Sequence, residues 1–110
     1  RDYMAALKYA AQQVMGDRSP LEGPLIVDIT IRLPVPQSWS AKKQEAALNG
    51  VLLPSKKPDW DNYAKMVDGL NLIVWVDDGQ IVDGIVRKRY AAKPGMWIKV
   101  TPYPVEGIFA

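Results

Sequence analysis

Six aspartates, half of the twelve acidic residues of the chain, lie in one stretch that begins at Asp59 and ends at Asp83. Lys65 is the only basic residue within this stretch. Short carboxylates provide hard oxygen ligands for Mg²⁺, which binds few carboxylates together with water and substrate phosphate oxygens. The stretch therefore predicts a magnesium-dependent site for phosphate chemistry.

The composition excludes several other kinds of site, because the 110 residues include no histidine and no cysteine. Zinc catalysis that depends on His and a Ser-His-Asp triad are both ruled out. The lack of Cys removes disulfides and thiolate zinc sites, and it fits a reducing compartment. Hydrolytic chemistry would have to use carboxylates, Lys, Tyr, metal and water.

Length and hydropathy predict one ordinary globular domain over residues 1–110, with 48% hydrophobic and 24% charged residues. The longest apolar runs are far shorter than the roughly 20 residues that span a bilayer, so we expect no membrane contact. Net charge is only +2, but basic residues border the acidic stretch on both sides. They are Lys42, Lys43, Lys56 and Lys57 before it and Arg87, Lys88, Arg89 and Lys93 after it. This border suits a polyanion, although a mixed solvated surface is the plainer interpretation.

Apolar periodicity predicts the elements that would position these residues. We expect helices at 3–14, 40–48 and 62–72, and strands at 25–35, 80–90 and 96–103. Ser40 is the expected cap of the short second helix, and Gly16 the expected end of the first. In the third helix the apolar side chains share one face, so Asp61, Lys65 and Asp68 would lie on the other.

Each acidic residue also has an ordinary structural interpretation. Asp59 and Asp61 could compete as the N-cap of the third helix, and Asp77 with Asp78 could form a turn before Gly79. Lys65 could be a simple i, i+4 partner of Asp61. A helix start and a turn need one or two acids, however, and clustered carboxylates repel one another unless a cation lies between them.

Two segments resemble the RusA family of Holliday junction resolvases. The first is Pro58-Asp59-Trp60-Asp61-Asn62 with Lys65, and the second is Trp75-Val76-Asp77-Asp78-Gly79-Gln80. The likeness extends over roughly residues 3–100, and Trp60 stands where the family usually has Leu. The resemblance implies an α+β fold with two main helices packed on a mixed β-sheet. The family usually begins with a β-strand and a basic loop ahead of the first helix, and Arg1 starts after that region, so we expect the sheet to lack that strand here.

The resemblance also implies the roles of individual residues. Asp59, Asp61 and Asp78 would bind Mg²⁺, or Mn²⁺ as an alternative, and should converge near a catalytic Lys65. The enzyme would be a cytoplasmic, bacterial or phage-encoded homodimer that cuts four-way DNA junctions in recombination and repair. Asp68 and Asp83 are reserve candidates, and Asp77 is expected to be a turn or supporting residue. The expected DNA contacts are Lys56, Lys57, Arg87, Lys88 and Arg89.

Three other functions remain open from the sequence. One is a nuclease for other branched DNA such as flaps or forks, and another is a DNA-binding module of the same fold without catalysis. The third is a structural or interaction protein whose acidic turn binds a cation.

Overall fold

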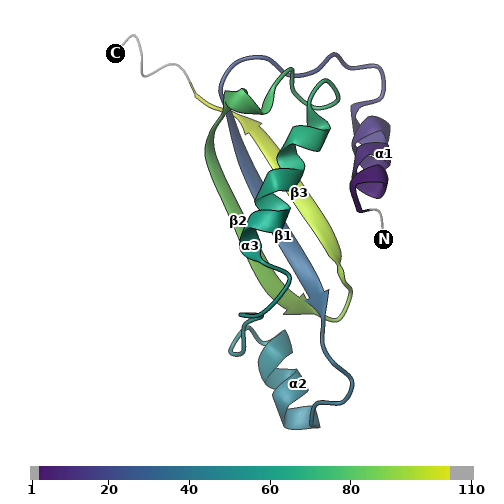
Figure 1. Cartoon of the computed structure of the whole chain (residues 1–110), viewed down its shortest axis with the longest axis vertical. Coiled ribbons are helices and arrows are strands. Elements are labelled where there is room, and N and C mark those ends of the chain that lie inside the picture. Colours follow the sequence, from purple (N-terminus) through teal and green to yellow (C-terminus); the bar gives the residue numbers. More distant parts are fainter. Residues whose placement is uncertain (1–2, 105–110) are drawn as a thin grey trace.

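The three strands form one mixed sheet in the order β2-β1-β3 (Figure 1). The computed structural model describes residues 3–104 of the chain. The strands are β1 (Leu25–Pro34), β2 (Ile81–Ala91) and β3 (Gly95–Pro102). β1 pairs in parallel with β2 and antiparallel with β3, which confirms the expected mixed sheet and α+β class.

The central strand β1 has one buried face because its apolar residues alternate with polar ones. Leu25, Val27, Ile29 and Ile31 are each at most 4% exposed. They form the core together with Leu70 and Trp75 from outside the sheet. The two-residue period that predicted this strand therefore also identified the side of the sheet that carries the core.

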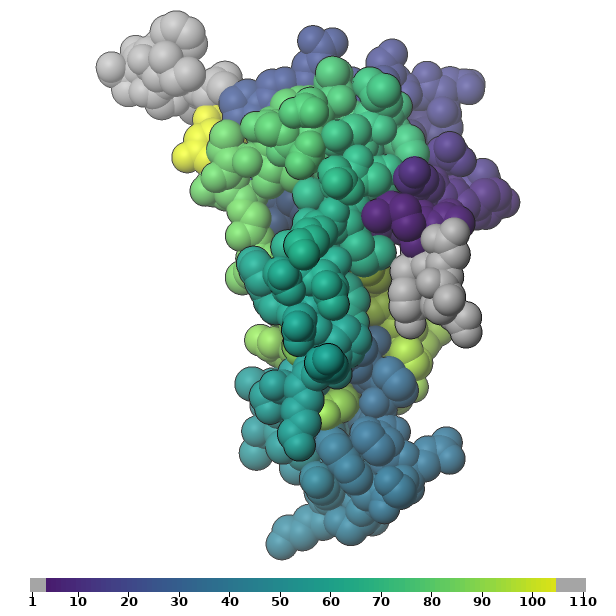
Figure 2. Space-filling model, viewed as in Figure 1, coloured from purple at the N-terminus to yellow at the C-terminus, as the bar shows by residue number. Residues whose placement is uncertain are grey.

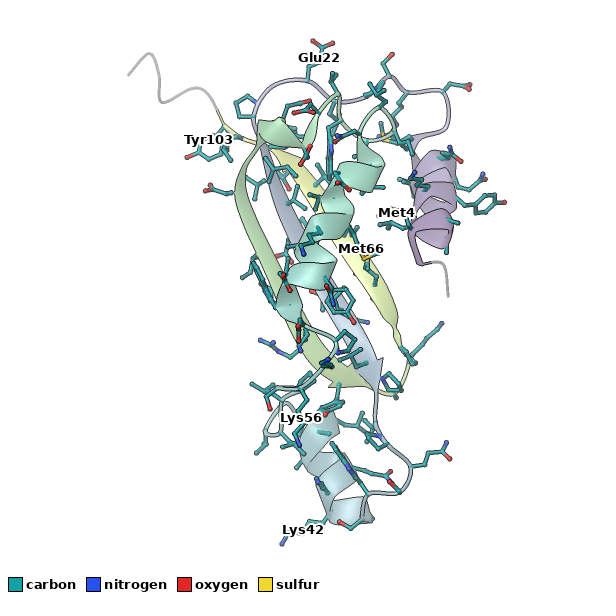
Figure 3. The ribbon with its side chains drawn as sticks, viewed as in Figure 1. Met4, Glu22, Lys42, Lys56, Met66 and Tyr103 are labelled. Carbon is teal, nitrogen blue, oxygen red and sulfur yellow. The ribbon has the colours of Figure 1, made fainter. Side chains whose placement is uncertain are left out.

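Helices cover this apolar face. Helix α3 (Trp60–Ala64) continues as the 3-10 helix η1 (Lys65–Leu70), and together they run along the sheet as one ridge (Figures 1 and 2). Helix α1 (Tyr3–Met15) packs beside η1 on the same side. Figure 3 shows Met4 reaching from α1 toward this ridge, where its sulfur occupies the space that a Cβ at residue 69 would need. Gly69 therefore leaves room for the Met4 side chain against η1.

The third predicted helix is only partly α-helical. The expectation was one helix over 62–72, but the α-helix begins at Trp60 and tightens into the 3-10 form after Ala64. Gly69, a poor helix former, lies in the tightened part. The expected faces are retained, because Leu70 is buried while Asp61 and Asp68 are exposed.

The remaining elements lie at the two ends of the sheet. Helix α2 (Ala41–Leu48) projects from one end, and its start is capped as expected by Ser40, whose Oγ accepts from the Lys43 N–H at 3.2 Å. The 3-10 turn η2 (Asp78–Gln80) precedes β2 at the other end. Gly16 follows α1 with φ of 54°, as expected for a helix stop. Within residues 3–104 no helix has the length and apolar character needed to cross a bilayer.

Candidate active site

The start of α3 presents two carboxylates and one ammonium to solvent. Asp59 occupies the N-cap position, but its side chain makes no capping hydrogen bond. Asp61 lies in the first turn, and its Oδ2 is 3.5 Å from the Nζ of Lys65. The side chains of Lys65 and Asp61 are 74% and 58% exposed. These groups are therefore accessible to a metal ion or a phosphate, and the fold does not use the Asp59 carboxylate as a cap.

The segment that carries Asp59 is fastened to the edge strand β2. Lys88 Nζ donates to the carbonyl oxygens of Lys56 at 2.6 Å and Pro58 at 2.7 Å. On the other side of Asp59, the indole Nε1 of Trp60 donates to the Val86 carbonyl oxygen at 2.7 Å. Three hydrogen bonds thus hold both flanks of Asp59 against β2, which fixes the backbone that presents its carboxylate.

The second acidic pair begins with a residue that has a structural role. Asp77 Oδ2 accepts from the Gly79 N–H at 2.8 Å, and the Asp77 N–H donates to Gln80 Oε1 at 2.9 Å. These reciprocal bonds form a capping box around η2, in agreement with the expectation that Asp77 is a turn residue. Gln80 Nε2 also donates to the carbonyl oxygens of Leu21 and Gly23, at 3.0 and 2.9 Å. The turn is therefore tied to the loop before β1.

Asp78 is held by a chain of side-chain hydrogen bonds that starts in the core. The indole Nε1 of the fully buried Trp75 donates to Asn71 Oδ1 at 2.9 Å, and Asn71 Nδ2 donates to Asp78 Oδ1 at 3.1 Å. Asn71 was not among the residues singled out from the sequence. The sequence feature that could have identified Asn71 is its position as a lone amide in the apolar run from Leu70 to Val76. A partly buried amide there needs hydrogen-bond partners.

The structure does not bring the three expected metal ligands together. Within residues 3–104, no group of three acidic side chains is close enough to hold a metal ion. Asp59 and Asp61 lie at the start of α3, whereas Asp78 opens η2 beyond the far end of η1. A groove with a largely apolar lining, whose walls include Trp60, Val67 and Asp78, separates them. The expected convergence of Asp59, Asp61 and Asp78 is therefore corrected to a carboxylate pair and a separate third carboxylate.

The reserve acids lie apart from this arrangement as well. Asp68 is exposed on the outer side of η1. Asp83 is exposed on β2, in register with Ile26 and hence on the face of the sheet opposite the core.

The basic residues divide between the two faces of the sheet. Lys88 points to the helix-covered side, where it binds the backbone before Asp59. Arg87 and Arg89 alternate with it and point to the opposite side. Arg87 NH1 donates to Asp28 Oδ1 at 2.6 Å and to Thr30 Oγ1 at 3.3 Å. Lys88 therefore lies on a different surface from Arg87 and Arg89, although the three residues are consecutive in sequence.

Comparison with known proteins identifies the family. Residues 1–101 match the family model described as Endodeoxyribonuclease RusA. The chain belongs to the RusA family. A relative from Bacillus subtilis (strain 168), named uncharacterized protein YqaN, is 41% identical over 83 residues, which cover 73% of this chain and 58% of the relative. No solved structure matches the chain. All candidate residues from Lys56 to Arg89 lie inside the part matched to RusA.

Proposed function

We propose that the protein is a divalent-metal-dependent endonuclease that cleaves branched DNA, with the four-way junction as its main substrate. The observation that carries the proposal is the exposed group of Asp59, Asp61 and Lys65, held on β2 by Lys88 and Trp60, within a chain of the RusA endodeoxyribonuclease family. Cleavage of such junctions would place the protein in DNA recombination and repair in the cytoplasm.

The carboxylate pair suits a single hard cation. Mg²⁺ is usually held by one or two carboxylates, with water and substrate phosphate oxygens completing its shell. Asp59 and Asp61 offer that donor set, and Mn²⁺ is compatible with the same ligands. A bound ion supplies Lewis-acid chemistry, since it acidifies water and neutralises charge on phosphate oxygens.

The other residues have separate proposed roles. The Lys65 ammonium lies beside Asp61, where it can neutralise charge that develops on a phosphate during cleavage. Asp78 lines the groove that also contains Trp60, with its carboxylate oriented by Asn71, and we propose that it contacts the same substrate strand there. Lys56 and Lys57 are exposed next to Asp59 and can bind the flanking phosphates.

Paired incision of a four-way junction requires two sites, which a symmetric homodimer of this chain would supply. Exposed apolar side chains are available for such an interface, among them Tyr9 and Val14 of α1, which are 65% and 74% exposed. Light scattering at micromolar concentration should therefore give the mass of a dimer.

A nicking assay on a synthetic four-way junction tests the function. We expect cleavage with Mg²⁺, no cleavage in EDTA, and slower cleavage of a linear duplex of matched sequence. Asp59→Asn should lower the rate at least about 100-fold, the scale on which one electrostatic group acts in catalysis. Binding to the junction should remain, because shape is preserved and a negative charge near phosphate is removed.

The matched control is Glu22→Gln, which removes one negative charge at the end of the molecule opposite Lys56 (Figure 3). It should cut at the wild-type rate. If Asp59→Asn also cuts at that rate, the catalytic assignment is wrong. If the wild type binds the junction and never cuts it, the protein is a DNA-binding module of the RusA fold.

A further inference from the structure

One face of the sheet is left uncovered by the helices, and one half of it is basic. The face opposite the core carries the alternate residues of each strand. In its last two cross-strand rows, Arg87 and Trp97 flank Thr30, and Arg89 and Gly95 flank Arg32. We call Arg32, Arg87, Arg89 and Trp97 the basic patch. The core residues that α1, α3 and η1 cover lie on the other face of the sheet.

The indole of Trp97 and the guanidinium of Arg32 form a stacked pair on this face. The guanidinium carbon of Arg32 lies 3.8 Å from the centroid of the Trp97 ring. The ring also lies over Gly95, because a Cβ at that position would come within 2.8 Å of it. The absence of a side chain at Gly95 thus lets the indole rest along the strand, and Trp97 is still 42% exposed.

The charges of the basic patch are only partly neutralised. Asp28 pairs with Arg87 at 2.6 Å, whereas Arg32 and Arg89 are direct cross-strand neighbours of like charge. Arg32 turns toward Trp97, and Arg89 NH1 donates to the Lys88 carbonyl oxygen at 2.9 Å. Neither arginine forms a salt bridge within residues 3–104, so both charges are available to an anionic partner on this face.

We propose that the basic patch binds an unpaired DNA strand, with a base stacked on Trp97 and Arg32 and the backbone phosphates held by Arg32 and Arg89. Aromatic and guanidinium planes stack on bases whose faces are free, which a continuous duplex does not offer. The inference rests on the proposed action on branched DNA, since a branch point is where bases lose their stacking partners.

The position of the patch relative to the carboxylate pair supports this assignment. Arg87 and Arg89 flank Lys88 in β2, and Lys88 holds the segment that carries Asp59 on the other face. Only the thickness of one edge strand therefore separates the two surfaces. A DNA strand that crosses the β2 edge can be bound by the basic patch on one side and reach Asp59 and Asp61 on the other.

A second copy of the chain fits this face less well. The centres of protein interfaces are depleted in charged residues. The basic patch has three arginines, and the apolar residues beyond it on this face are Ile26 and Ile85 of β1 and β2. The charge and the exposed indole favour a polyanion with free bases.

Fluorescence anisotropy of a labelled short oligothymidine, measured in EDTA, tests the proposal without any cleavage. Trp97→Leu should weaken binding about tenfold, the scale of one lost base-stacking contact, whereas Trp97→Phe should weaken it about twofold. The Arg32→Gln/Arg89→Gln variant should weaken binding at least about tenfold at low salt. The control Lys8→Gln/Lys42→Gln removes the same charge from exposed positions on α1 and α2, and should weaken binding less than about threefold. Thermal unfolding verifies that each variant is folded.

Three results would overturn the proposal. The first is that Trp97→Leu and Trp97→Phe bind the oligothymidine with equal affinity. The second is that the arginine and lysine double variants lose the same amount of affinity. The third is that the arginine double variant changes the oligomeric state while it binds DNA normally. The last result would make this face a subunit interface. Asp59→Asn should bind the oligothymidine like the wild type. If the wild type nicks the junction normally but does not bind the oligothymidine, the basic-patch proposal alone is rejected. If the wild type binds the oligothymidine but never nicks the junction, the nuclease proposal is rejected.

Discussion

The two acidic pairs of this chain look alike in sequence and differ in structure. Asp59 and Asp61 flank the first residue of α3, and Asp59 makes no capping bond although it occupies the capping position. Asp77 and Asp78 stand at the start of η2, where both accept hydrogen bonds from neighbouring groups. Capping and core contacts account for the second pair, whereas the structure gives the Asp59 carboxylate no such use.

This difference shows that some aspartates of this chain stabilise the fold, whereas others keep their carboxylates available for a ligand. Around Asp59 the backbone is held by neighbouring side chains, since Lys88 and Trp60 both donate hydrogen bonds to backbone carbonyl oxygens. Around Asp77 the carboxylate itself holds the fold. A carboxylate that is positioned by other groups keeps its oxygens available for a metal, and one that caps a turn does not.

The strongest test of the comparison is Asp61→Ala. We expect it to lower junction nicking at least about 100-fold, because a proposed metal ligand is lost. Its loss of stability should be within about 0.5 kcal/mol, since the exposed Asp61–Lys65 pair is worth only a few tenths. Nicking and thermal unfolding of the same sample measure both effects. A fall of many degrees in Tm with nicking per folded molecule unchanged would reverse the assignment.

A weaker effect should follow from Lys88→Met, which removes the ammonium and keeps much of the side-chain length. The two carbonyl contacts that hold the segment before Asp59 are then lost. We expect nicking to fall about tenfold, since small displacements of catalytic groups are costly. If Lys88 acts through position, the salt dependence of junction binding should stay as in the wild type. A slope reduced by about one phosphate contact would instead show that Lys88 binds DNA directly.

The smallest effect is expected from Asp77→Ala. Loss of the bond to the Gly79 N–H should cost about 1 kcal/mol of stability, as for other capping residues. Asp77→Asn is the matched control, because its amide oxygen can still accept that bond. Denaturant unfolding compares the three proteins. Equal midpoints for Ala and wild type would mean that the capping box around η2 contributes nothing.

The sequence was sufficient where a local pattern determines the structure. Alternation identified β1 and its buried face, Ser40 was recognised as a cap, and the i, i+4 spacing placed Lys65 beside Asp61. These features depend on residues that are neighbours along the chain. The segment with Asp59, Asp61 and Lys65, taken together with the segment from Trp75 to Gln80, also led to the RusA family, which the comparison of residues 1–101 confirmed.

The sequence was insufficient where long-range contacts decide the structure. The 3-10 segment that follows Ala64 packs against α1, where Met4 approaches Gly69, and no residue near Gly69 in sequence indicates that contact. The separation of Asp78 from Asp59 depends on the path of η1 along the sheet. Lys88 looked like one more phosphate contact between two arginines, and only the strand showed that it binds backbone carbonyls on the other face.

Trp60 has a consequence for how this protein can assemble. β2 is an edge strand with β1 as its neighbour on one side, and such edges attract further strands from other chains. The indole of Trp60 donates to the Val86 carbonyl of this edge. A strand that added alongside β2 would have to displace the indole and loosen the segment that carries Asp59. Trp60 therefore opposes strand addition at the middle of this edge, because the Val86 carbonyl oxygen already has a partner.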